Sequence, residues 1–211
     1  MPDLTVRPLT VARWADLEAL FAARGCGAAR RCWCMYYRRT GRASELFGGR
    51  TRADASRAAL RALARSDLPP GLIAYRARQP VGWISLGPRD DFARLKRSSV
   101  MKAVDDTPVW SIVCFVVPAE YRNQGVARGL LEGAIAYARR RGARLLEAYP
   151  VDRPGRSSDE AMWFGARSMY DAAGFHEVAR RRPHRPVVRR SVARARRPAS
   201  RRATARPGAR R

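Results

Sequence analysis

A short polar stretch between an apolar run and a helical pattern carries the residues best placed for chemistry. It runs from Arg122 to Arg128 and reads Arg-Asn-Gln-Gly-Val-Ala-Arg. The apolar run before it covers residues 109–117, and apolar residues recur at helical spacing after it, so we expect the order strand, turn, helix. The first turn of a helix presents unpartnered backbone N–H groups and the positive end of the helix dipole. The stretch therefore predicts a site for a phosphate group.

Two common phosphate-binding loops do not fit this stretch. Gly125-Val-Ala127 lacks the third small residue of the dinucleotide fingerprint G-x-G-x-x-G. No Gly-Lys-Ser/Thr follows it, as a Walker loop would require.

The stretch resembles instead the acyl-CoA loop of the GNAT superfamily of N-acetyltransferases, which reads Arg/Gln-x-x-Gly-x-Gly/Ala. Residues Arg122 to Ala127 match this pattern at every specified position. A second segment, Ala166 to Phe175, resembles the helix-and-strand signature of the same family, in which a tyrosine, here Tyr170, precedes Gly-Phe by four residues. This resemblance implies an α/β fold, with a twisted mixed β-sheet flanked by helices in a single domain.

The resemblance also implies acetyl-CoA as the acyl donor, with no metal. Backbone amides of the loop would hold the pyrophosphate, and the guanidinium groups of Arg122 and Arg128 would add charge for its oxygens. The residues expected at the donor site are Phe115, Val116, Val117, Arg122, Asn123, Gln124, Gly125, Val126, Ala127 and Arg128.

Direct transfer of an acetyl group to a primary amine needs an acid for the leaving thiolate and a base or water path for the amine. We expect Tyr170 to be the acid, because a phenol with a pKa near ~10 is protonated at neutral pH. Some relatives carry a glutamate nine residues before the loop motif, but Val113 stands there. Glu147, a carboxylate within an apolar strand, is the candidate base, since such a group must have a partner. A salt-bridged Glu147 and a water chain are the alternatives.

Candidate acceptor-binding residues follow the first helix. Trp33, Tyr36 and Tyr37 could hold a cation or a flat group by stacking, or form a small core beneath a long loop. Asp106, beside Asp105, is a candidate for binding a cationic acceptor, with a turn role as the alternative. The expected acceptor is a small-molecule amine. A protein N-terminus or lysine, and a dimeric state, are left open.

Length and charge set wider bounds. A chain of 211 residues is long enough for one domain with a real core, which we expect over residues 3–190. The formal net charge is +25, and residues 180–211 contain 14 arginines and no acid. Residues 191–211 are expected to form a disordered tail rich in Arg, Ala and Pro. A basic chain suits CoA and also nucleic acid, but the tail carries no recognised nucleic-acid-reading module.

Two other interpretations of the sequence follow from these features. A catalytically weak acyl-CoA-binding module is favoured by Val113, and a nucleic-acid-associated protein by the tail. No apolar leader and no span of about 18 apolar residues is apparent, so we expect a cytoplasmic protein with no membrane contact and reduced thiols. The spacing of Cys26, Cys32 and Cys34 does not fit a zinc site.

The periodicity predicts alternating elements. Strands are expected at residues 4–8, 72–76, 81–86, 109–117, 144–149, 175–179 and 186–190, helices at 11–21, 55–64, 125–141 and 162–173, and a long loop or broken helices at 25–50. A helix joins the strands at 109–117 and 144–149, so these two should be parallel.

Overall fold

The computed structural model of the chain describes residues 4–40, 51–153 and 159–193. The strands are β1 (Leu4–Pro8), β2 (Gly71–Arg76), β3 (Gln79–Pro88), β4 (Trp110–Val116), β5 (Leu145–Ala148), β6 (His176–Arg180) and β7 (Pro186–Ser191). The α-helices are α1 (Trp14–Ala22), α2 (Gly27–Cys32), α4 (Arg52–Leu63), α5 (Ala93–Lys96), α6 (Val126–Arg140) and α7 (Arg167–Ala172), and the 3₁₀ helices are η1 (Val11–Arg13), η2 (Arg89–Asp91), η3 (Ala119–Tyr121) and η4 (Asp159–Phe164).

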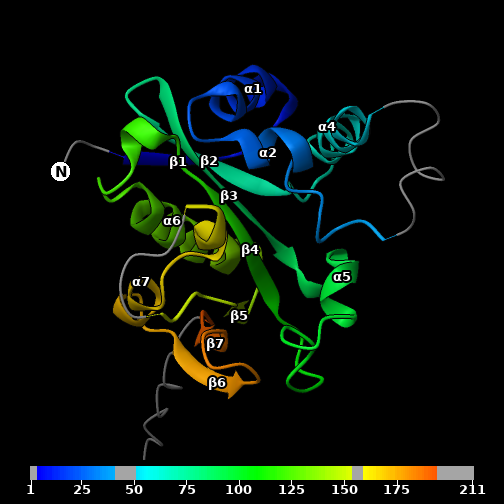
Figure 1. The fold of residues 1–211 in the computed structure, drawn as a ribbon, viewed down its shortest axis with the longest axis vertical. Helices are drawn as coiled ribbons and strands as arrows, with labels where there is room; N and C mark the ends of the chain where they lie inside the picture. The colour runs from blue at the N-terminus through cyan, green and yellow to red at the C-terminus, as the bar shows by residue number, and fades with distance from the viewer. Residues whose placement is uncertain (1–3, 41–50, 154–158, 194–211) are drawn as a thin grey trace, which may run out of the picture.

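Within these ranges the strands form one mixed sheet in the order β1-β2-β3-β4-β5-β7-β6. Only the β4–β5 pair is parallel, and it is the pair joined through α6, as predicted. The other neighbouring pairs are antiparallel. The predicted fold class, a twisted mixed sheet flanked by helices, is confirmed (Figure 1).

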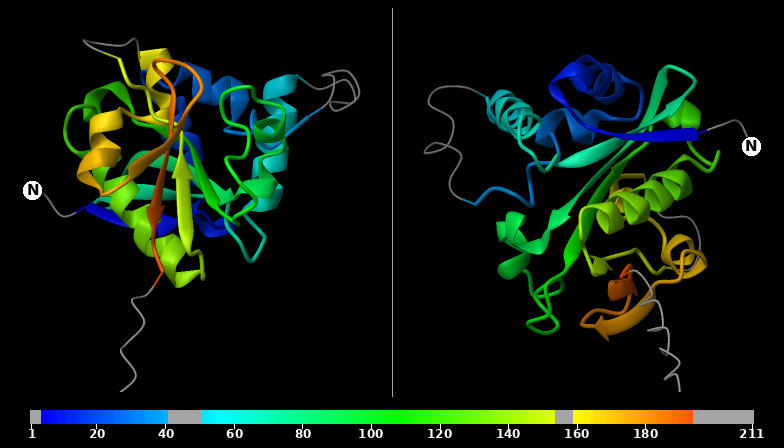
Figure 2. Two further views of the ribbon diagram at one scale, coloured as in Figure 1. Left: turned by 90° about the horizontal axis from the view of Figure 1, so that it is seen from below. Right: turned by 180° about the vertical axis from the view of Figure 1, so that it is seen from behind.

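Helices cover both faces of the sheet because the strands are apolar on both faces. In β2, Leu72 and Ala74 pack in the cluster that includes α6, whereas Ile73 and Tyr75 pack with α1, α2 and α4. This alternation is the period of two expected of a strand. Figures 1 and 2 show α1, α2 and α4 on one side of β1–β4 and α6 on the other.

Two glycines let α6 lie directly against β1. A Cβ added at Gly129 would meet Leu4 Cδ2 at 2.2 Å, and one added at Gly133 would meet Val6 Cβ at 2.7 Å. These glycines are four residues apart and so share one face of the helix. At Gly133 the clash is with an atom next to the backbone, so a side chain there would push α6, and the loop before it, off the sheet. At Gly129 the terminal methyl group of Leu4 would have to turn aside.

The prediction of one continuous helix over residues 162–173 is wrong. The chain forms η4, turns at Gly165, whose φ is +79°, and then begins α7. A left-handed residue ends a helix, and a Cβ at Gly165 would meet Met169 Cε at 2.6 Å. The tail expected at 191–211 and the domain start at residue 3 lie almost wholly outside the described residues. Among the described helices, none combines the length and apolarity that a bilayer crossing needs.

An ion-pair cluster ties α7 to β6. Glu177 accepts hydrogen bonds from Arg180 Nε at 2.8 Å and from Arg167 Nη1 at 2.7 Å. Arg180 first, and then Arg167, lower the pKa of Glu177 to about 2.

The stability that Glu177 contributes should therefore depend on pH on the acid side. A depressed folded-state pKa gives stability that is complete above the unfolded pKa of about 4.3 and is lost as the pH falls toward about 2. We expect Glu177→Gln to lower the Tm at pH 7 and to change it much less near pH 2, as measured by calorimetry. Glu132→Gln, at an exposed position on α6, is the control. Equal losses for Glu177→Gln at both pH values would contradict the assignment.

Candidate functional site

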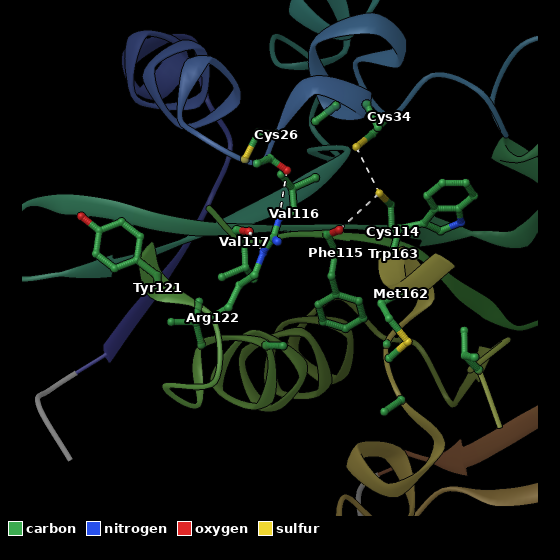
Figure 3. A pocket seen from close by; sticks show the side chains of 18 of the residues that line it. Cys26, Cys34, Cys114, Phe115, Val116, Val117, Tyr121, Arg122, Met162 and Trp163 are labelled. Atoms are coloured by element: carbon green, nitrogen blue, oxygen red, sulfur yellow. Dashed lines mark hydrogen bonds between the residues drawn. The ribbon is translucent and has the colours of Figure 1, made fainter. Parts of the chain in front are cut away.

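A large cleft opens where β4 and β5 part. Their pairing ends at Ile112 and Ala148, and beyond this point residues 113–117 form one wall. The opposite wall comes from the segment around η4 and the start of α7, including Met162, Trp163 and Met169. The cleft has a volume of about 1560 Å³, whereas a typical ligand pocket has a volume of about 300–1000 Å³. Figure 3 shows Cys114 and Phe115 of one wall and Met162 and Trp163 of the other.

The N-terminus of α6 lies at one end of this cleft. Gly125 is the N-cap residue, with φ of +78°, and no side chain caps it. Gly129 N–H reaches back to Gly125 C=O at 3.0 Å, so the preceding amides of the first turn point toward the cleft end. Residues 121–128 all line the cleft. This arrangement, a helix terminus at the mouth of an apolar groove, suits an anionic ligand.

The loop before α6 is held from two directions. Arg122 donates from Nε to Val117 C=O at 3.1 Å and from Nη2 to Gly25 C=O at 2.9 Å. Gln124 donates from Nε2 to Glu120 C=O at 2.6 Å, and its own side-chain and backbone oxygens accept from Arg76. Arg122 thus fastens the loop to neighbouring backbone, a contact shown in Figure 3, rather than presenting both arms to a phosphate as the sequence suggested.

The predicted donor-site residues come together. The end of β4 and the loop through Arg128 form one continuous surface of the cleft, because every residue proposed for that site lines it. The charged side chains among the described lining residues are all arginines: Arg31, Arg122, Arg128 and Arg153. Their field favours an anionic ligand.

The predicted acceptor-binding residues are divided. Tyr36, which is 46% exposed, and Tyr37 both line the cleft and meet edge to face at 4.9 Å. Trp33 does not line it; the indole is buried and stacks on Trp14 at 5.7 Å, so it is a core residue. Asp106 is exposed before the start of β4, at the end of the strand away from the cleft. The structure therefore does not bring Trp33 or Asp106 to this site.

Tyr170 lies behind the wall of the cleft. Its side chain is fully buried, and its hydroxyl donates to Phe164 C=O at 2.9 Å. The ring meets Phe115 and Phe175 edge to face. Burial raises the pKa of Tyr170 well above its usual value, so the phenol is protonated. Among the described residues that line the cleft, Tyr36, Tyr37 and Tyr121 carry phenols, and burial raises the pKa of Tyr37.

Glu147 faces a different environment from the cleft. It is fully buried and accepts from Arg89 Nη1 at 2.7 Å and from Arg189 Nε at 2.8 Å. Tyr149 donates to the same carboxylate at 2.7 Å. The partners that a buried carboxylate requires are present. Glu147 does not line the cleft, and its hydrogen bonds to two guanidinium groups indicate a structural role. The geometry gives Glu147 no access to an amine there.

The sequence analysis missed the wall made by η4 and α7 and a pair of cysteines. Trp163, which is 37% exposed, and Met162 enter the cleft from η4. Cys114 on β4 faces Cys34, with their sulfur atoms 3.5 Å apart. Because 80 residues separate Cys34 from Cys114 in the chain, no local sequence pattern indicates their contact. Among the described residues, no group of three or more Cys, His, Asp or Glu side chains is placed to hold a metal.

Comparison with known proteins agrees with this architecture. A mutant of an agmatine N-acetyltransferase, solved without ligand, shares 11% identity, with a TM-score of 0.52 and coverage of 90% of this chain and 99% of that one. An acetyltransferase from Thermus thermophilus shares 16% identity, with a TM-score of 0.50 and coverage of 89% and 96%. The GNAT domain of S. lividans PAT shares 18%, with a TM-score of 0.50 and coverage of 88% and 89%.

At such identities the likeness concerns the fold. A search of curated protein sequences gives no significant match. Residues 36–161, more than half of the chain, match the acetyltransferase (GNAT) family. This stretch contains β4, the loop at Gly125 and α6, which form one wall of the cleft and one of its ends. The chain therefore belongs to the GNAT family of acetyltransferases.

Proposed function

We propose that this protein transfers the acetyl group of acetyl-CoA to a primary amine by direct attack in a ternary complex. The observation that carries the proposal is the junction of the open β4 edge with the uncapped start of α6 at Gly125. The helix terminus and its arginines would take the pyrophosphate, and the groove along residues 113–117 would take the thioester arm. A small-molecule amine is the expected acceptor.

The acceptor would approach from the aromatic end of the cleft. Tyr36, Tyr37 and Trp163 offer faces and edges for a flat group. None of the described lining residues is a carboxylate or histidine, which favours a water path over a single side chain for the proton of the amine. This route replaces the role first considered for Glu147.

The proposal is tested by incubating the protein with acetyl-CoA and a panel of aromatic amines, amino acids and polyamines. Acetylated products should be detected by mass spectrometry rather than by measuring the thiol of the released CoA. A thiol reagent would also react with the four cysteines of the protein. At least one amine should be converted faster than in a control without protein. Binding of acetyl-CoA with no product from any amine would favour the catalytically weak binding module.

The acid that protonates the leaving thiolate is proposed to be Tyr170. Its hydroxyl would have to give up the hydrogen bond to Phe164 C=O and donate to the CoA sulfur instead. Catalytic hydrogen bonds often form only in the complex with substrate. We expect Tyr170→Phe to lower kcat by about 100-fold, the lower end for loss of an acid, with acetyl-CoA affinity unchanged. Tyr37→Phe, made in parallel, is the comparison. A larger loss of kcat in Tyr37→Phe than in Tyr170→Phe would assign the role of the acid to Tyr37, which borders the cleft.

A further inference from the structure

Two thiols that are distant in the sequence meet in the lining of the cleft. Cys34 follows α2, Cys114 lies on β4, and the Cys34 thiol donates to Cys114 Sγ at 3.5 Å. The structure records both as free thiols. Figure 3 shows the two side chains directed at one another across the top of the β4 wall.

The backbone around Cys34 is fixed in an unusual conformation. Trp33 and Cys34 both have φ of +49°, and they are consecutive non-glycine residues in the left-handed region. Such residues cost free energy and persist only where the surroundings impose them. Trp33 is held by its stack on Trp14, and the Cys34 N–H donates to Cys32 Sγ at 3.2 Å. The surroundings therefore keep Cys34 against β4.

The two thiols differ in access. Both residues line the cleft, but Cys114 is partly exposed whereas Cys34 is only 4% exposed. Its hydrogen bond to Cys114, together with burial, raises the pKa of Cys34 well above its usual value. An oxidant entering the cleft would therefore meet Cys114 first, with Cys34 already in contact as the second thiol.

We propose that Cys34 and Cys114 form a reversible disulfide when a peroxide enters the cleft. Cys114 sulfur attacks the peroxide, the O–O bond breaks, and Cys114 becomes a sulfenic acid while an alcohol or water leaves. Cys34 sulfur then attacks the sulfenic sulfur, an S–S bond forms, and water leaves with the thiol proton. Two thiols are oxidised as one peroxide is reduced. The sulfur atoms must approach from 3.5 Å to a bond length of about 2.0 Å.

The bond would join the segment after α2 to β4 just beyond the point where the sheet opens. Under the proposed function, acetyl-CoA in the groove along β4 would cover Cys114 and slow its oxidation, and the disulfide would oppose donor binding. This consequence rests on the proposed function; formation of the disulfide does not.

The test treats the full-length protein with hydrogen peroxide, blocks the remaining thiols and maps linked peptides by mass spectrometry. A protease that cuts after aromatic residues separates Cys32 from Cys34 at Trp33. We expect a Cys34–Cys114 linked peptide that a thiol reductant removes. It should be absent in Cys34→Ser and Cys114→Ser and retained in Cys26→Ser, which changes another cysteine of the same cleft.

Absence of that peptide, a Cys32–Cys34 link in its place, or stable higher oxidation of Cys114 would overturn the proposal. A second arm repeats the oxidation with saturating acetyl-CoA, which has no free thiol. Slower linkage is expected in the wild type but not in Gly125→Glu. If acetyl-CoA does not slow disulfide formation in the wild type, the disulfide proposal is unaffected and the proposed position of the donor is contradicted.

Discussion

Gly125→Glu is expected to abolish measurable acetyl-CoA binding while the fold is retained. The added carboxylate would stand at the uncapped start of α6, where the amides and dipole otherwise attract an anion. Each charge-assisted hydrogen bond contributes about 1.5–3 kcal/mol, and about 1.4 kcal/mol is a tenfold change in Kd. Loss of two such bonds, about 3–6 kcal/mol, would weaken binding by roughly two to four orders of magnitude, before repulsion is counted. Isothermal calorimetry measures the effect directly.

Gly142→Glu is the matched control. Gly142 follows the other end of α6, has φ of +83°, and has no atom within 4 Å of an added Cβ. Both substitutions impose the same left-handed strain and the same charge change, but only Gly125 borders the cleft. Circular dichroism and Tm should change alike in the two variants. Unchanged acetyl-CoA affinity in Gly125→Glu would show that the donor binds elsewhere.

Glu147→Gln should cause the largest loss of stability that we expect from a single isosteric change. It removes the charge between Arg89 and Arg189, which are mostly buried, with side-chain exposures of 13% and 7%. Removing one partner of a buried ion pair costs about 3–5 kcal/mol. For a domain of this size, that corresponds to a Tm lowered by roughly 10 °C. Urea unfolding and calorimetry measure the two quantities.

The same variant separates a structural role for Glu147 from a catalytic one. Glu132→Gln, on the exposed side of α6, controls for loss of a carboxylate and should leave the Tm nearly unchanged. At a temperature where Glu147→Gln is folded, its kcat and pH profile should follow those of the wild type. A normal Tm with a kcat lowered by orders of magnitude would restore Glu147 as the base.

The helix terminus proposed to hold the donor can be predicted from the sequence because its features are local. Gly125 and the residues beside it follow a strand and begin a helix, and this order alone sets where unpaired amides gather. The alternation of Leu72 and Ile73 between the two faces of the sheet is local in the same way. The succession of strands along the chain and the parallel β4–β5 pair can therefore be predicted from the sequence.

The failures involve residues whose role depends on distant neighbours. Trp33 is an aromatic residue of a type that often binds ligands, but its ring stacks on Trp14, which no spacing rule connects to it. Asp106 lies close to β4 in sequence, yet at the end of the strand away from the cleft. The periodicity of a strand reports the face on which a side chain lies, not which end of the sheet holds the site.

The residue pattern alone determined the helix terminus that suits a phosphate and the periods of the strands and helices, because these arise from hydrogen bonding and periodicity over a few consecutive residues. The fold class followed from the resemblance of two short motifs to a known family. It could not show that Glu147 is neutralised by arginines 58 and 42 residues away, or that Cys34 meets Cys114 across 80 residues. Those contacts exist only after the sheet order brings β3, β5 and β7 together and places the segment after α2 over β4. Burial then fixes the partner of each charge and thiol, because a group removed from water must be satisfied by its nearest neighbours.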